Sequence, residues 1–594
     1  MPVLLDRSFP RSLDALVATF STPAYQGAQL QAWLFEGADA RRAAEAALAA
    51  HGVQAVIRSA YKPLLHAFLE EIDLSGLTAV TMQYPRHDHA IPNRFLLESY
   101  PLQSMFAGVA WTVQPGPVEH EDGALRYRLE LRYADGRVDK RDVLAPNVRC
   151  VDHVGQAQIS PAGWVCATHV ADEADIDQAW PTEVEGVFEA VVRAVQTHSW
   201  GNEEPFFEQM DIRVDMPGME FKLDYGQEQV STFEAMHEDL YFALLEVFQQ
   251  HSGRPVGNRG MQPGQIVPDI RRHDGDAHVR IEVGPYRALE PLAVDALASS
   301  DAAAFAASQD PFATLDAPLS EMRIAEAMLR IKGERFSVHS RQGRPVQAVY
   351  RKGSGPSVLI SAAQHANETS GPVGVLRAAQ QLDARDDAHF TLIALENPDG
   401  YAMHQRLIKT HPHHMHHAAR YSALGDDLAY REHAPWFETG ARRDAVAMTG
   451  AELHINLHGY PSHEWTRPWS GYLPRKFEMW TIPKGFFLVL RHQPGYADKS
   501  RRLMEGVTAK LAEMPGLVEF NARQVAAFEA HAGALGFEIM NGIPYTITES
   551  EVEPTPISLI TEFPDETIYG DAFVFAHTAQ MSTVMAAMDV YRSL

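Results

Sequence analysis

The sequence has very little cysteine and no long apolar run. Cys150 and Cys166 are the only two cysteines among 594 residues, too few for a disulfide framework in a chain of this length, so we expect a reducing compartment. No run of about 18 apolar residues occurs, and charge appears already at Asp6 and Arg7, so neither a membrane span nor a secretory signal is predicted. These absences favour a soluble, cytoplasmic protein with no membrane partner.

Positive charge is also scarce. The chain carries 51 Lys and Arg against 77 Asp and Glu, which gives a net charge of −26. Such a surface repels the phosphates of nucleic acids and of anionic lipids. We therefore exclude nucleic acid as an expected partner.

Apolar residues, in contrast, are abundant enough for several cores. They make up 45% of the chain, and charged residues make up only 22%, which is the balance of a globular protein. At roughly 100–200 residues per domain the length predicts three or four domains, or two large ones. Changes in composition suggest a mainly helical region over 1–115, an α+β accessory domain over 116–325 and a C-terminal domain over 326–594.

The first 325 residues mix helical and strand patterns. Helical spacing over residues 36–49 and 62–72 predicts an opening pair of helices. Alternation over Tyr127–Tyr133, followed by a turn, predicts a strand that enters a hairpin. Two amphipathic helices are predicted over Glu183–Thr197 and Thr232–Gln250.

In the last 270 residues, by contrast, short apolar strands alternate with helices. The predicted strands are Val358–Ala362, Phe390–Leu395, Leu453–Leu457, Phe486–Leu490 and Ile557–Phe563, and the predicted helices are Val373–Leu382, Arg501–Met514 and Ala572–Tyr591. Strands that are apolar on both faces indicate an α/β domain with a mixed, mostly parallel sheet between helices. Functional side chains of such sheets lie at the carboxyl ends of the strands.

Two of these strand ends carry residues that bind metals. The first strand runs directly into His365-Ala-Asn-Glu368, and another strand ends at His458. Catalytic zinc sites take three ligands from His, Glu and Asp and leave a fourth position open, so these three residues are candidates for one site. Alternatively, Glu368 is only a capping partner of the helix that follows it.

Four segments then occur in an order that resembles the M14 family of zinc carboxypeptidases. They are His365-Ala-Asn-Glu368, Glu396-Asn-Pro-Asp-Gly-Tyr401, His458-Gly-Tyr460 and Thr561–Gly570. The likeness covers about residues 335–594 and leaves the first half unassigned, and some segments also resemble the succinylglutamate desuccinylase and aspartoacylase branch. It implies a mixed eight-stranded sheet between helices and a hydrolase that holds Zn²⁺.

The resemblance also implies roles for individual residues. It makes His365, Glu368 and His458 the zinc ligands and Glu562 the general base. Glu549 remains a competitor for the base, because residues 542–549 look like a similar approach to a catalytic glutamate. Tyr545 is the candidate for a substrate-contacting tyrosine.

Arginines in this family polarise the scissile carbonyl and hold a substrate carboxylate, tasks that suit a planar, permanently charged group. Here Arg406 is the catalytic candidate, and Arg420 and Arg431 are the substrate-binding candidates. Ala429 and Tyr430 stand where the desuccinylase branch has a single asparagine. A clamp for a free C-terminal carboxylate is therefore in doubt, and an ordinary surface arginine stays an alternative for each candidate.

Histidines crowd the stretch between these elements. They are His404, His411, His413, His414, His416 and His417. They suggest a second metal site or a grip on an acidic substrate, but the favoured interpretation is a polar loop whose histidines are mostly solvated.

Together these observations predict a zinc metallocarboxypeptidase that releases a C-terminal residue through glutamate-assisted attack of zinc-bound water. Its substrate would be a peptide or an N-acyl amino acid. The alternatives are a zinc amidase or deacylase, and a catalytically inactive binding or scaffold protein. Residues 1–325 would shape or cover the cleft, or form a homo-oligomer contact.

Overall fold

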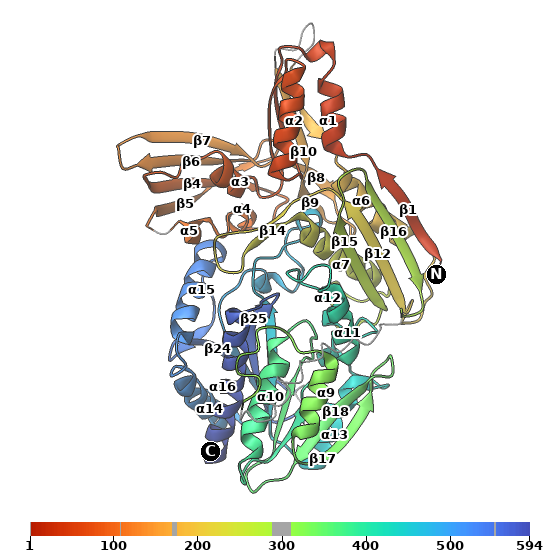
Figure 1. Ribbon diagram of the computed structural model, residues 1–594, viewed down its shortest axis with the longest axis vertical. Helices are drawn as coiled ribbons and strands as arrows, with labels where there is room; N and C mark the ends of the chain where they lie inside the picture. Colours follow the sequence, from red (N-terminus) through yellow and green to blue (C-terminus); the bar gives the residue numbers. More distant parts are fainter. Residues whose placement is uncertain (1, 107, 169–174, 288–309, 552–553) are drawn as a thin grey trace, which may run out of the picture.

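A nine-stranded sheet organises the second half of the chain in this computed structural model (Figure 1), which describes residues 2–106, 108–168, 175–287, 310–551 and 554–594. In spatial order its strands are β17 (Glu334–His339), β18 (Pro345–Arg351), β20 (Phe390–Ile393), β19 (Val358–Ala362), β21 (Leu453–Pro461), β25 (Ile557–Glu566), β22 (Phe487–His492), β24 (Ile543–Glu549) and β23 (Glu538–Met540). The strands predicted from apolar runs are all present, within a few residues of their expected ends.

Parallel pairing is confined to the middle of this sheet and to one outer pair. Strands β20, β19, β21 and β25 run parallel, as do β22 and β24, whereas the other four pairs are antiparallel. The expectation of a mostly parallel, eight-stranded sheet was therefore wrong for the edges. Short turns join β17 to β18 and β23 to β24, and strands joined by so short a turn can pair only antiparallel.

Helices cover both faces of the sheet and enclose two cores. One face packs against α10 (Ser370–Asp383), α14 (Ala497–Leu511) and α16 (Asp571–Ser593), three helices that the sequence predicted. The other face packs Leu359 and Ile393 against α13 (Gly440–Thr449). The apolar strands are therefore covered on both sides, as their composition requires.

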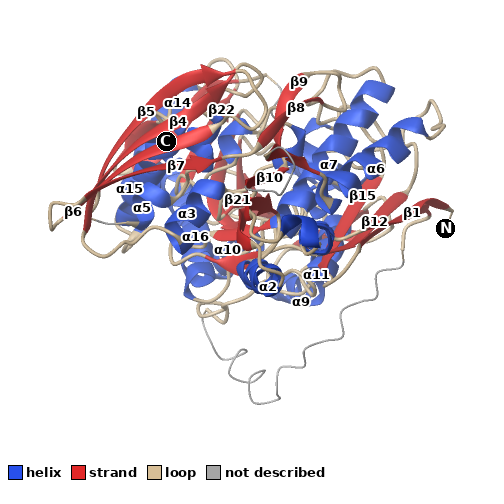
Figure 2. Cartoon of the chain, turned by 90° about the horizontal axis from the view of Figure 1, so that it is seen from above, coloured by secondary structure: helices blue, strands red, loops and turns tan. Residues whose placement is uncertain are grey.

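The first half forms three four-stranded sheets. The first has the order β1 (Val3–Phe9), β16 (Ala277–Gly284), β12 (Gln209–Met216) and β15 (Gln265–Arg272) and packs on α6 (Glu183–Thr197) and α7 (Thr232–His251). The second has the order β11 (Ile176–Trp180), β10 (Gly163–Thr168), β2 (Gln29–Leu34) and β3 (Gln54–Ser59) and packs on α1 (Ser12–Phe20) and α2 (Ala38–Ala50). The third has the order β5 (Ala110–Glu119), β4 (Leu77–His87), β6 (Arg126–Tyr133) and β7 (Val138–Leu144) and packs on α3 (Pro63–Glu70). Seen from above, the first and third sheets lie on opposite sides of the molecule (Figure 2).

These sheets cross the boundary that the sequence suggested at residue 115. β1 pairs with β16, β2 with β10 and β4 with β6, so residues before and after 115 share all three sheets. The described part of residues 1–115 also contains four whole strands and the start of β5 beside its helices, so the stretch is not mainly helical. Composition along the chain could not reveal pairing between strands that lie up to about 270 positions apart.

Helix α7 joins the two halves. The sequence predicted an amphipathic helix, but nearly all of its side chains are buried, including Glu234, His237, Glu238 and Asp239. One side packs on β15, and the opposite side packs on loops of the second half that contain Met415, Tyr421 and Trp465. The first half therefore lies against the carboxyl-end loops of the nine-stranded sheet.

Across the described residues, no helix combines the length and the apolar character needed to cross a membrane.

Candidate metal centre

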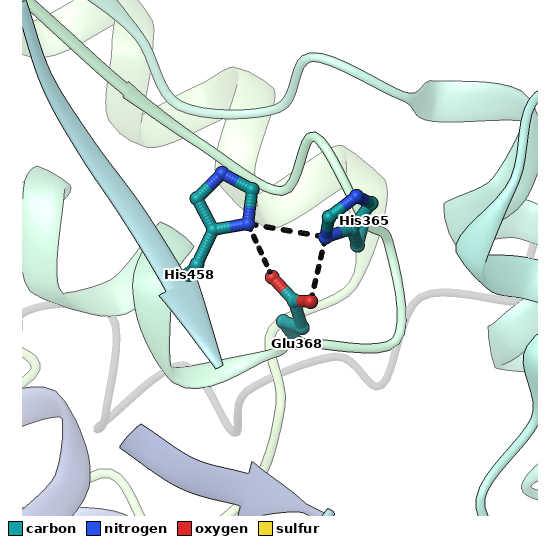
Figure 3. Close-up of side chains that lie close together, drawn as sticks. All are labelled: His365, Glu368 and His458. Atoms are coloured by element: carbon teal, nitrogen blue, oxygen red, sulfur yellow. Dashed lines mark hydrogen bonds and ion pairs between the residues drawn. The ribbon is translucent and has the colours of Figure 1, made fainter. Parts of the chain in front are cut away.

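His365, Glu368 and His458 converge at one end of the large sheet (Figure 3). The Nδ1 atom of His365 lies 2.7 Å from Oε1 of Glu368, and Nδ1 of His458 lies 3.1 Å from Oε2 of Glu368. The two Nδ1 atoms are 3.1 Å apart. All three side chains are buried.

Local structure explains how residues about 90 positions apart meet. β19 and β21 pair in parallel with Ala362 opposite Leu457. His365 lies just past the carboxyl end of β19, and His458 lies in the last half of β21, one residue beyond that pair. The buried Ala363 has a φ of 53°, and this left-handed conformation turns the chain away from the strand direction. Gly459 is needed next to His458, because a Cβ atom there would lie 1.9 Å from Oδ1 of Asp565.

The donor set fits a zinc ion. Metal–ligand bonds of about 2.0–2.2 Å place two tetrahedral ligands roughly 3.3–3.6 Å apart. The separations of 2.7 to 3.1 Å found here are shorter, so a small outward shift of the three side chains would admit the ion. Oε2 of Glu368 is buried, and its 3.1 Å contact with Nδ1 of His458 lacks hydrogen-bond geometry. Each oxygen of this carboxylate faces one imidazole nitrogen, an arrangement that a bound cation would complete.

A layer of polar side chains holds the ring of His365. Nε2 of His365 lies 3.3 Å from Oδ1 of Asp427, and Nε2 of Gln364 donates to the same oxygen at 3.4 Å. Oε1 of Gln364 in turn accepts from Arg442 at 2.7 Å and from Asn456 at 3.2 Å. A carboxylate on the far nitrogen of a ligating histidine fixes the orientation of the ring. Sequence reasoning did not assign this role to Asp427; its only signal was the acidic pair that follows Gly425.

Arg420 is the predicted arginine that reaches the cluster. Its Nη1 atom donates to Oε1 of Glu368 at 2.8 Å. Burial alone would raise the pKa of Glu368, but His365 and His458 bring it well below its usual range. Burial and Arg420 would lower the pKa of His365, but Glu368 and Asp427 outweigh them and raise it. The cluster therefore stabilises a carboxylate between two imidazoles.

Glu562 lies on the neighbouring strand, directly opposite His458 in the parallel pairing of β21 and β25. Burial raises the pKa of Glu562 well above its usual range and the charge of Glu368 raises it further, while Arg420 and Lys484 oppose the shift. Lys484 is buried with its Nζ atom lacking a hydrogen-bond partner. Burial lowers the pKa of Lys484 to about 7, against the opposing charge of Glu562.

The other predicted site residues lie elsewhere. Arg431 is buried in ion pairs of 2.7 Å with both Asp426 and Glu438. Arg406 lies 3.7 Å from Asp211, and among the described residues it forms no hydrogen bond or ion pair with the cluster.

Tyr545 and Glu549 lie on β24, which is separated from β25 by β22. The hydroxyl of Tyr545 donates to Glu538, and Glu549 is exposed at the end of its strand. This placement favours Glu562 over Glu549 as the residue next to the cluster.

The histidine run is mostly buried, which corrects the expectation of a solvated loop. His404, His414, His416 and His417 are all buried, and His413 is exposed. Nδ1 of His417 lies 2.6 Å from Glu238 of α7, and His414 contacts Glu220. Because α7 and the β13–β14 hairpin (Glu220–Lys222, Gln229–Ser231) cover this loop, its solvation could not be judged from local sequence. Among the described residues, only the cluster of His365 meets the geometry of a three-ligand metal site.

One of these histidines makes stability depend on pH. Burial lowers the pKa of His404 to about 4, whereas an unfolded imidazole titrates near 6.5. Between about pH 6.5 and pH 4 the imidazole is protonated in the unfolded chain but not in the folded one, which favours unfolding. The neutral, buried His404 therefore contributes its full stability above about pH 6.5, and this stability is lost as the pH falls towards 4. We expect His404→Phe to reduce the loss of unfolding free energy between pH 7 and pH 5 by about 2 kcal/mol, measured by denaturant titration.

The exposed His51 provides the matched control for that measurement. His51→Phe should leave the difference between pH 7 and pH 5 as it is in the parent chain. Equal pH dependence of the parent and of His404→Phe would show that His404 is protonated alike in both states.

No family model and no curated protein matches this chain. Among solved structures it is similar to a metallo-carboxypeptidase from Burkholderia cenocepacia, with 12% identity over 53% of this chain and 76% of that chain and a TM-score of 0.30. A metallo-carboxypeptidase from Pseudomonas aeruginosa has 16% identity over 54% of this chain and 73% of its own, with a TM-score of 0.29. Carboxypeptidase A from Helicoverpa armigera has 11% identity over 55% of this chain and 90% of its own, with a TM-score of 0.30. These scores are too low to assign a fold or a function, so any assignment rests on the residues of the chain itself.

Proposed function

We propose that this protein is a zinc-dependent hydrolase that cleaves an amide bond, with the release of a C-terminal residue from a peptide as the first candidate reaction. The observation that carries the proposal is the convergence of His365, Glu368 and His458 beside Glu562. Three ligands of this kind leave one coordination position for water or substrate.

A zinc ion held by these residues supplies a Lewis acid and lowers the pKa of a bound water to about 7. Among the described residues, nothing forms a hydrogen bond with the carboxylate of Glu562, so its oxygens are available to accept a proton. Its raised pKa suits a group that accepts a proton and later returns it to the leaving amine. The guanidinium of Arg420 provides fixed positive charge at the same place, where negative charge develops on the carbonyl oxygen.

A second candidate is an amidase or deacylase that acts on N-acyl amino acids or modified peptides. Arg431, one of the residues expected to hold a terminal carboxylate, already pairs with Asp426 and Glu438. Both carboxylates would have to release it before it could bind a substrate. This pairing supports a substrate that needs no clamp on a free C-terminus.

Zinc content and a substrate panel test the proposal. We expect about one zinc per chain after metal addition, and hydrolysis that is lost with a chelator and restored by zinc. The panel contains an N-blocked dipeptide, its C-terminal amide and an N-acyl amino acid. A carboxypeptidase should cleave the free dipeptide at least tenfold faster than the amide.

Two other outcomes of these measurements would contradict the carboxypeptidase assignment. Equal cleavage of the free and amidated dipeptides would contradict the carboxypeptidase assignment and favour the amidase. Substoichiometric zinc without hydrolysis of any substrate would contradict both and leave a scaffold protein.

A further inference from the structure

A second cavity lies away from the metal centre. It has a volume of about 630 Å³, within the range of small-molecule sites. Its walls come from α9 (Glu321–Arg330), the start of β18, the chain after β20 and the outer side of α11 (Pro398–Leu407). In Figure 1, α9 lies next to α11, with which it is in contact.

Helix α11 separates this cavity from the histidine loop. Ala402, Gln405 and Arg406 line the cavity from one side of α11, at the three- and four-residue spacing of a helical stripe. Lys409 lines it from the turn that follows the helix. The opposite side carries His404, whose ring lies 6.1 Å from that of His416. The cavity is therefore a separate site and not an extension of the metal centre.

The walls of the cavity combine an apolar surface with excess positive charge. Met322, Ile324, Ala325 and Met328 project from α9, and Leu395 lies opposite them. Among the described residues, four cationic side chains and one carboxylate, that of Glu321, line the same space, although the chain as a whole has a net charge of −26. The four cationic side chains are Arg287, Arg344, Arg406 and Lys409.

Two of these cations are poorly neutralised by the protein. Arg344 lies 3.0 Å from Asp399, and Arg287 lies 2.8 Å from Asp211. Arg406 reaches the same Asp211 only at 3.7 Å, and burial lowers the pKa of Arg406 against the opposing charge of Asp211. Lys409 is exposed at the rim, with no ion pair among the described residues.

We propose that this cavity binds an amphipathic monocarboxylate of medium chain length, with the carboxylate at Arg406 and Lys409 and the alkyl chain along the apolar side of α9. The carboxylate supplies Arg406 with a closer partner than Asp211, which lies 3.7 Å away, since a guanidinium and a carboxylate form a strong paired hydrogen bond. The alkyl chain lies against the exposed Met322 and the partly exposed Ala325 of α9, and its transfer from water adds a favourable contribution for each buried methylene. The site does not depend on zinc or on hydrolysis.

Calorimetric titration with decanoate, decanol and decylammonium tests both parts of the proposal. We expect decanoate to bind saturably, with one molecule per chain and a Kd below about 1 mM. Decanol should bind at least tenfold more weakly, because it lacks the charge. Decylammonium should not bind measurably. Equal binding of all three probes, or no saturable binding of decanoate, would overturn the proposal.

Variants then locate the site. Arg406→Ala should weaken decanoate binding at least tenfold and Lys409→Ala about threefold, while Ala325→Phe, which fills the cavity, should abolish it. The control for Arg406 is Arg385→Ala, because the two side chains are 30% and 25% exposed and each pairs with aspartate. The control for Ala325 is the exposed Ala522→Phe on α15 (Leu517–Ala532).

Both controls should bind within twofold of the parent chain. Thermal unfolding establishes that each variant is folded, and Lys409→Ala changes an exposed side chain, so it remains informative if Arg406→Ala is destabilised. Unchanged decanoate binding by folded Arg406→Ala and Ala325→Phe chains would place the ligand elsewhere and refute the site.

Discussion

Replacing Glu562 by glutamine should reduce hydrolysis by about a thousandfold without loss of zinc. The amide of glutamine has nearly the same shape as the carboxylate but cannot accept and return a proton at neutral pH, and general acid–base catalysis contributes about 10² to 10⁴ in rate. Because His365, Glu368 and His458 remain, metal content should stay near that of the parent. Steady-state kinetics on the best substrate of the panel and elemental analysis of the same sample measure the two effects.

Glu549→Gln is the matched control for this variant. Glu549 also lies near the end of a strand of the large sheet, but it is exposed and two strands away from β25. We expect its rate to stay within twofold of the parent. If Glu549→Gln lost activity and Glu562→Gln kept it, the assignment of the base would have to be reversed.

Removal of a ligand should have an equally large effect, but through metal loss. His458→Ala and His365→Ala each leave two ligands, too few to hold zinc against competing water. We expect zinc affinity to fall more than a hundredfold and hydrolysis to reach background at equimolar zinc. Asp427→Ala keeps all three ligands but frees the ring of His365, so a smaller loss of about 10- to 100-fold in affinity is expected.

The affinity series is measured by competition with a chromogenic chelator. His389→Ala serves as the control, because His389 also belongs to the large-sheet half of the chain but pairs with Tyr350 instead of the cluster. Unchanged zinc affinity in His458→Ala would mean that the three side chains do not hold the ion together.

The strands and helices of the second half were predictable from the sequence because their signals are local. β19 was predicted with its observed ends, and the strands that became β21 and β25 were found from the same apolar pattern. Parallel pairing follows from strands that alternate with helices. The convergence of His365, Glu368 and His458 then follows from short motifs at the ends of neighbouring strands.

The sequence could not determine the contacts between distant segments. Arg406 and Arg420 both stand near expected site elements, yet only Arg420 reaches Glu368, while Arg406 lies on the outer stripe of α11 beside a separate cavity. The sequence predicted that Arg431 binds substrate, but in the structure its guanidinium forms ion pairs with Asp426 and Glu438. The burial of the histidine loop likewise depends on α7, more than 150 positions earlier in the chain.

The sequence by itself therefore determined which residues can bind a metal and which strands carry them, since ligand type and strand pattern are properties of short segments. Only the tertiary structure decided which of the predicted arginines contacts Glu368, which face of α11 lines a cavity and how the first half covers the second. Those outcomes depend on charge pairing and packing between segments far apart in the chain, and no local pattern records which partner each side chain meets.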